Sequence, residues 1–124
     1  MTTLLDTIDL YVEMAKQAKE DAGNFKMHVE TWVQYGNYRR ANQFAQQAMA
    51  AATHANACAN IALTLSDNLH GRERQQGLNK ARTALGFYRQ ALEYTIQANQ
   101  IIVNNESPQL NKGAIGGYRE LRFL

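Results

Sequence analysis

The sequence predicts an all-α fold, a compact bundle of about four to five helices. Its 124 residues include one proline and are rich in Ala, Gln, Leu and Arg, whose side chains lose little freedom in a helix. Apolar residues recur at alternating steps of three and four, the spacing of one helix face. Strand-favouring Val and Ile are sparse. A chain of this length supports one core, so we expect a single domain over residues 1–112 and a glycine-hinged C-terminal tail over residues 113–124.

The first helix is predicted from Thr3 to Ala22. Thr3 is a suitable N-cap with Asp6 three residues on, and Gly23 can take the left-handed position that ends a helix. The helix is amphipathic and packs on one side. Its apolar face consists of Leu4, Ile8, Tyr11, Ala15, Ala18 and Ala22.

A second, shorter helical stretch is predicted from Phe25 to Tyr35, with Asn24 as its N-cap. Gly36 interrupts the pattern. A continuous helix from Phe25 to Ser66 would be about 60 Å long, which is awkward in so short a chain. We therefore expect a turn or kink near Gly36.

The longest predicted helix is alanine-rich and runs over residues 38–66. Its small apolar residues recur as a heptad seam that faces a partner helix, and a second row beside the seam makes the apolar face wide. Alanine lets two helix axes approach nearer than the usual distance of about 8–10 Å. Stability must then come from larger flanking side chains, because a buried alanine removes little area from water. The seam, called here the alanine seam, is Phe44, Ala48, Ala51, Ala55, Cys58, Ala62 and Leu65, and the second row is Ala41, Ala45, Met49, Ala52, Ala59 and Leu63.

Residues 67–71 are predicted to form a loop, and a further helical region follows from Arg72 to about Asn104. Two adjacent apolar seams in this region indicate contact with two neighbours. One seam is Leu78, Ala81, Leu85, Tyr88, Leu92 and Thr95, and the other is Ala84, Phe87, Ala91, Tyr94, Ala98 and Ile101.

The C-terminal region begins with Ser107-Pro108, an N-cap followed by proline that predicts a short turn. Residues 113–117 are glycine-rich and form the predicted hinge. The apolar tail that follows, residues 118–124, either docks on its own domain or reaches a neighbouring subunit, which would make the protein an oligomer.

Residues 36–48 align with residues 86–98, and we interpret the match as a duplicated helix pair. The repeated frame resembles the turn and second helix of tetratricopeptide-like repeats, in which a glycine opens a helix and an aromatic residue follows two positions on. The resemblance covers thirteen residues twice, at a spacing of fifty where those repeats have about thirty-four, and it implies a protein-binding scaffold. The identities are Gly36, Tyr38, Arg39, Ala41, Gln47 and Ala48 with Gly86, Tyr88, Arg89, Ala91, Gln97 and Ala98.

The formal net charge of +2 is too small to indicate nucleic-acid binding by itself, but it is unevenly distributed. Residues 1–30 carry six acids and three bases, and residues 31–124 carry five acids and ten bases. This asymmetry either attracts an anionic partner or lets the first helix lie against basic neighbours. No run of about 18 apolar residues and no signal peptide are present, so we expect a cytoplasmic protein without a membrane partner.

Few residues suggest catalysis or a metal. His54 and Cys58 are one helical turn apart, a spacing that suits two metal ligands, but a complete zinc site would need ligands from another chain. An alanine-lined helix face does not activate a thiol, so Cys58 is interpreted as a core residue. No catalytic residue, metal or cofactor is predicted.

Arginines and aromatic residues are the candidate binding residues. Arginine suits phosphate or carboxylate and tyrosine suits stacking, although the same tyrosines could simply pack in helix crossings. Tryptophan and tyrosine are also common anchors at protein interfaces. The candidates are Trp32, Tyr35, Tyr38, Arg39, Arg40, Arg72, Arg74, Arg82, Tyr88, Arg89, Tyr118, Arg119 and Phe123, and Lys80 belongs to the same basic set.

The sequence therefore favours a non-enzymatic module that binds a partner protein, as an adaptor, assembly factor or inhibitor. We also expect a homo-oligomer, a dimer or higher. The alternative function is binding of nucleic acid or a nucleotide through the tyrosine and arginine residues. An enzyme whose site is assembled at an oligomer interface is the third hypothesis.

Overall fold

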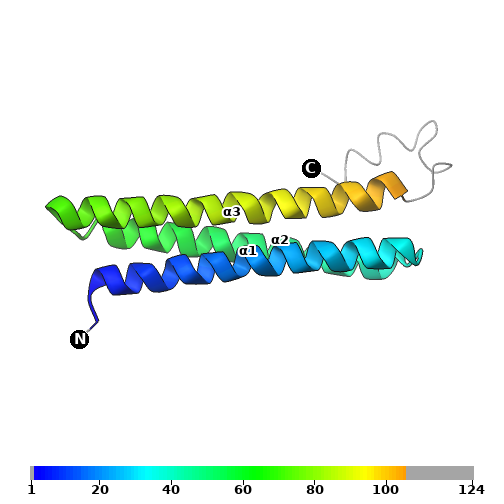
Figure 1. The fold of residues 1–124 in the computed structure, drawn as a ribbon, viewed down its shortest axis with the longest axis horizontal. Helices are drawn as coiled ribbons and strands as arrows, with labels where there is room; N and C mark the ends of the chain where they lie inside the picture. The colour runs from blue at the N-terminus through cyan, green and yellow to red at the C-terminus, as the bar shows by residue number, and fades with distance from the viewer. Residues whose placement is uncertain (1, 106–124) are drawn as a thin grey trace.

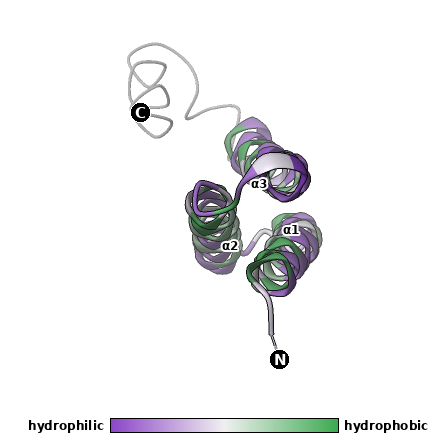
Figure 2. Ribbon diagram, turned by 90° about the vertical axis from the view of Figure 1, so that its left-hand side faces the viewer, coloured by the Kyte–Doolittle hydropathy of each residue, from purple (hydrophilic) through white to green (hydrophobic). Residues whose placement is uncertain are grey.

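The computed structural model describes residues 2–105, which form three long helices. These are α1 (Leu4–Gln34), α2 (Tyr38–Ser66) and α3 (Gly71–Asn105). Helix α2 returns antiparallel to the other two (Figure 1), and the end-on view shows the three helices at the corners of a triangle (Figure 2). Each helix contacts both of the others.

The all-α prediction is confirmed, but the described residues contain three helices and not four to five. None of the three has an apolar stretch sufficient to cross a membrane. The turn predicted after Ser107, the glycine hinge and the tail over residues 113–124 lie outside the described residues.

The predicted break at Gly23 is wrong, because α1 continues through Asn24 to Gln34. The buried stripe that starts at Ile8 continues past the glycine to Val33, so packing holds this segment in one helix. Gly23 serves close packing instead. A Cβ atom there would lie 3.2 Å from Cε2 of Tyr94 in α3, so the missing side chain makes room for the tyrosine ring.

The start of α1 is capped as predicted. The backbone N–H of Asp6 donates to Oγ1 of Thr3, and the backbone N–H of Thr3 donates to Oδ2 of Asp6, both at 3.1 Å. This reciprocal pair is a capping box, which satisfies two backbone donors that a helix start otherwise leaves without partners.

The predicted turn at Gly36 is confirmed and is tightly specified. Gly36 has φ +73°, the left-handed conformation, and its N–H donates to the carbonyl of Val33. The N–H of Asn37 donates to the carbonyl of Trp32, which completes a Schellman motif. Asn37 then caps α2, since its Oδ1 accepts from the N–H of Arg40 at 3.1 Å.

Alanines from all three helices form the middle of the core. The alanine seam of α2 is buried or half-buried throughout, and both partner helices belong to the same chain. The most deeply buried stripe of α2 combines the seam with its second row. It consists of Ala41, Ala45, Ala48, Ala52, Ala55, Cys58, Ala59, Ala62 and Ser66, whereas Met49 and Leu63 of the second row are exposed.

Larger side chains occupy the two ends of the core and its flanks. Ile8 and Leu69 are buried at the end where α1 starts. Val29 and Ile102 are buried at the other end. Aromatic rings flank the central alanines, and each of these larger side chains can remove more apolar area from water than an alanine does.

The two copies of the repeat occupy different positions in the fold. Gly36 lies in the turn before α2, but Gly86 lies inside α3, so the described residues contain no duplicated helix pair. The matched alanines are nevertheless all fully buried: Ala41, Ala48, Ala91 and Ala98. The repeat therefore reflects a shared packing pattern of buried alanines beside aromatic flanks.

The contact between α2 and α3 is close where Ser66 meets Gly77. A Cβ atom on Gly77 would lie 2.7 Å from Oγ and 3.1 Å from Cβ of Ser66. Ser66 is fully buried, and its hydroxyl donates to the carbonyl of Ala62 at 2.8 Å. Neither residue has room to enlarge without moving a helix.

We predict opposite effects for two glycine-to-alanine substitutions in α3. Gly86→Ala should stabilise the fold by about 0.5–1 kcal/mol, because alanine favours a helix and no atom lies within 4 Å of the new Cβ. Gly77→Ala should destabilise it by about 1–3 kcal/mol through overpacking against Ser66. Urea unfolding followed by circular dichroism measures both. Equal shifts for the two variants would contradict the close contact.

Candidate binding site

The structure distributes the predicted site residues over three places. Tyr118, Arg119 and Phe123 lie outside the described residues. The other ten divide between the end of the bundle at the α1–α2 turn (Trp32, Tyr35, Tyr38, Arg39, Arg40), the opposite end (Arg72, Arg74) and the body of α3 (Arg82, Tyr88, Arg89). We call the first group, Trp32, Tyr35, Tyr38, Arg39 and Arg40, the end face.

A row of three side chains forms the centre of the end face. The guanidinium carbon of Arg40 lies 4.9 Å from the centroid of the Trp32 ring. The Trp32 and Tyr35 ring centroids are 6.1 Å apart, with the ring planes tilted by 56°. These are the geometries of a cation–π contact and an aromatic pair.

The members of the end face differ in exposure. Tyr35 is 76% exposed, the highest value among the large hydrophobic residues that the structure describes as exposed. Trp32 is half-buried and packs against the core cluster that contains Val33 and Ile102. The core thus holds Trp32 in place, while the Tyr35 ring is exposed to solvent.

Tyr38 has a structural role. It is half-buried, and its hydroxyl donates to the backbone carbonyl of Asn105. This bond joins the first residue of α2 to the last residue of α3. The structure therefore supports the interpretation that Tyr38 packs in a helix contact.

The end face is positively charged. Residues 31–66 contain no Asp or Glu, and both charged residues of α2, Arg39 and Arg40, lie in its first turn. A helix start already carries partial positive charge, so two arginines there reinforce it. A depression of about 240 Å³ lies beside them and is lined by Asn37, Arg39, Arg40 and Gln43.

None of the three ion pairs between described residues involves an arginine of the end face. Lys26 pairs with Glu30 within α1 at 3.6 Å. Lys80 of α3 pairs with Asp9 of α1 at 2.5 Å, and Arg74 pairs with Asp67 at 3.3 Å. The Lys80 contact fits the expectation that the acidic first helix lies against basic neighbours. Neither Arg39 nor Arg40 is paired with a carboxylate among residues 2–105.

The two tyrosine–arginine pairs of the repeat are not brought together. Tyr38 contacts the end of α3, whereas Tyr88 lies about 25 Å back along the α3 axis at 1.5 Å per residue. Tyr88 packs against the central alanines. Arg72 and Arg74 are about 45–50 Å from the end face by the same measure. The predicted arginines therefore do not form one surface.

His54 and Cys58 are adjacent, with His54 Nε2 3.8 Å from Cys58 Sγ. Cys58 is 2% exposed, and burial raises the pKa of its thiol above the ordinary value of 9.0. Residues 2–105 contain no cluster of three or more His, Cys, Asp or Glu that could hold a metal ion. The surroundings of Cys58 therefore suit a protonated thiol that packs in the core.

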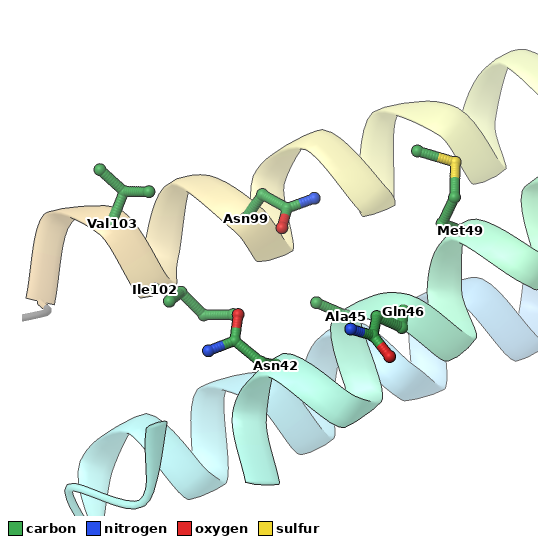
Figure 3. Close-up of a pocket in the computed structure, with 7 residues that line it drawn as sticks. All are labelled: Asn42, Ala45, Gln46, Met49, Asn99, Ile102 and Val103. Carbon is green, nitrogen blue, oxygen red and sulfur yellow. The ribbon is translucent and has the colours of Figure 1, made fainter. Parts of the chain in front are cut away.

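A groove between α2 and α3 was not predicted. It has a volume of about 320 Å³ and lies near the end of the bundle that carries the end face (Figure 3). Helical periodicity indicates which faces pack but not where two helices leave space, so polar Asn42 and Gln46 beside exposed Met49 were the available signal. Its lining is uncharged and consists of Asn42, Ala45, Gln46, Met49, Asn99, Ile102 and Val103.

No protein-family model, curated protein or solved structure matches this chain. No residue role can therefore be transferred from a relative. The end face is interpreted from its own residues.

We predict that native Cys58 reacts with a small disulfide reagent at pH 8 roughly 100-fold more slowly than the urea-unfolded chain, because the thiol is buried and protonated. A Cys58→Ala, Thr83→Cys variant, with an exposed thiol on α3, is the control and should react at a similar rate in both states. The raised pKa also implies stability that is present below pH 9.0 and declines above it. Rapid reaction of native Cys58 would contradict its burial.

Proposed function

We propose that the protein is a non-enzymatic interaction module that binds a partner protein through the end face. The observation that supports this most is the row of Tyr35, Trp32 and Arg40, in which Tyr35 and Arg40 are exposed and Trp32 is half-buried. Tyrosine, tryptophan and arginine are the residues that most often dominate the binding energy of protein interfaces. Here all three meet around the turn between α1 and α2.

The rigidity of the turn favours binding. Backbone hydrogen bonds fix Gly36 and Asn37, and Trp32 is held by the core. Side chains that are already ordered lose little entropy when a partner docks, so more of the contact energy appears as affinity.

The charge of the end face indicates the chemistry of the partner. Arg39 and Arg40 favour a surface that presents carboxylates. The Tyr35 ring favours an apolar pocket next to those carboxylates. An acidic segment with an apolar anchor meets both requirements.

Binding of nucleic acid or a nucleotide is the second candidate, supported by the same stacking rings and arginines. A nucleic-acid strand is usually held by a basic surface that follows its backbone. The separation of Arg39 and Arg40 from Arg72, Arg74 and Arg89 gives no such path, so this hypothesis has less support than a protein partner.

A quantitative pull-down from native extract tests the proposal. The tag belongs at the N-terminus, because α1 starts at the end of the bundle opposite the end face (Figure 1). We predict that the wild-type chain recovers a stoichiometric protein and that the Tyr35→Ala, Arg40→Glu variant recovers at least about tenfold less of it, as expected for two interface anchors.

Arg72→Glu is the matched control, since it makes the same charge change on an exposed residue at the far end. It should recover as much partner as the wild-type chain. Equal recovery by the end-face variant would refute the proposal. Recovery of nucleic acid that falls steeply with salt would favour the second candidate instead.

A further inference from the structure

The outer face of α2 lacks charge. Helix α1 contains six acidic and three basic residues, and α3 contains two acidic and five basic residues. Helix α2 contains only Arg39 and Arg40, both in its first turn. From Ala41 to Ser66 no Asp, Glu, Lys or Arg is present, although many of these residues are exposed.

The exposed residues of α2 have a regular spacing. They recur at alternating steps of four and three on the side opposite the buried alanines, so they form a second heptad stripe that neither α1 nor α3 covers. We call it the outer stripe. Its members, all exposed, are Gln43, Gln47, Ala50, His54, Ala57, Ile61 and Thr64.

Charge depletion distinguishes the centre of an interface from ordinary surface, which normally mixes charges of both signs. We infer that α2 pairs with α2 of a second copy of this chain along the outer stripe, in antiparallel orientation. The stripe begins at Gln43, next to the end face, and the inference does not depend on the proposed function.

The absence of charge suits a second copy as the occupant. In a twofold dimer the same surface meets itself, so any charge on it lies near a like charge from the other copy. An uncharged stripe avoids this repulsion. By contrast, α1 carries charged side chains from Asp6 to Glu30 and α3 carries them from Arg72 to Glu93, so these faces would place like charges near each other in a twofold pair.

The position of the arginines selects the antiparallel orientation. A parallel pair would place two copies of Arg39 and Arg40 together at two adjacent helix starts, where the positive ends of both helix dipoles also lie. In the antiparallel pair the two helix starts are about 40 Å apart, at 1.5 Å per residue, and the dipoles oppose each other. The end face of each copy stays accessible.

We place the twofold axis at His54, the central member of the outer stripe, so that the two stripes overlap over their full length. His54 then faces His54 of the second copy. Ala50 then lies opposite Ala57, and these small side chains on either side of the axis let the helices approach closely. Farther out, Gln47 faces Ile61.

The size of the contact indicates a dimer that dissociates on dilution. The stripe is about 33 Å long at 1.5 Å per residue. With a width of about 10 Å, the two copies bury roughly 700 Å² in total, which is in the range of weak, transient contacts.

Sedimentation equilibrium of the full chain over a concentration series tests the inference. The wild-type chain should dimerise. Ala50→Glu alone and Ala57→Lys alone should each weaken the dimer at least about tenfold, because each places an unpaired charge in the interface. The combined variant should return to within about threefold of wild type, because each glutamate then faces a lysine of the other copy.

Gln90→Glu, an exposed position on α3, is the control and should dimerise like wild type. Circular dichroism establishes that each variant is folded. Dimerisation of the combined variant would show independently that neither substitution prevents folding. A wild-type chain that stays monomeric, because the face is free or is covered by its own C-terminal segment or another protein, overturns the inference. So does a dimer that both single variants leave intact. A combined variant weaker than either single one overturns the antiparallel orientation.

Discussion

The close approach of three helices along rows of alanine is the constraint on which the rest of the structure depends. Ala15, Ala55 and Ala91 are fully buried in the middle of the bundle. A larger side chain at such a position would force the helices apart, since interiors are packed without spare volume. The space for aromatic rings is therefore on the flanks, where Phe87 and Tyr94 are half-buried.

This arrangement explains where binding residues occur. Toward the α1–α2 turn the core contains Val29, Val33 and Ile102 beside the alanines of α2 and α3. Trp32 packs there and in turn supports Arg40 and Tyr35. The outer side of α2 is a separate property of its sequence. From Ala41 to Ser66 it carries no charge, whereas α1, which also packs through alanine, carries charged residues on its outer side.

Features with local causes could be predicted from the sequence. The capping box at Thr3, the turn at Gly36 and both ends of α2 depend on neighbouring residues, and the structure confirms them. Gly23 was misjudged because its role depends on Tyr94, 71 positions away. Which candidate binding residues lie together also depends on contacts between residues far apart in the sequence. Periodicity places Tyr38 and Tyr88 on helix faces, but only the helix lengths and directions reveal that one meets the end of α3 and the other the central alanines.

The stability of an Ala55→Leu variant tests the central constraint most directly. Ala55 is fully buried, with 0% of its surface exposed to solvent. If close helix contact requires alanine at this position, urea unfolding of Ala55→Leu should show a loss of about 1–3 kcal/mol in the free energy of unfolding, because the larger side chain overpacks the core. Gln90→Leu, at an exposed position of α3, is the control and should change that free energy by no more than about 0.5 kcal/mol. A gain in stability for Ala55→Leu would contradict the account, because it would mean that the core has room that alanine leaves unfilled.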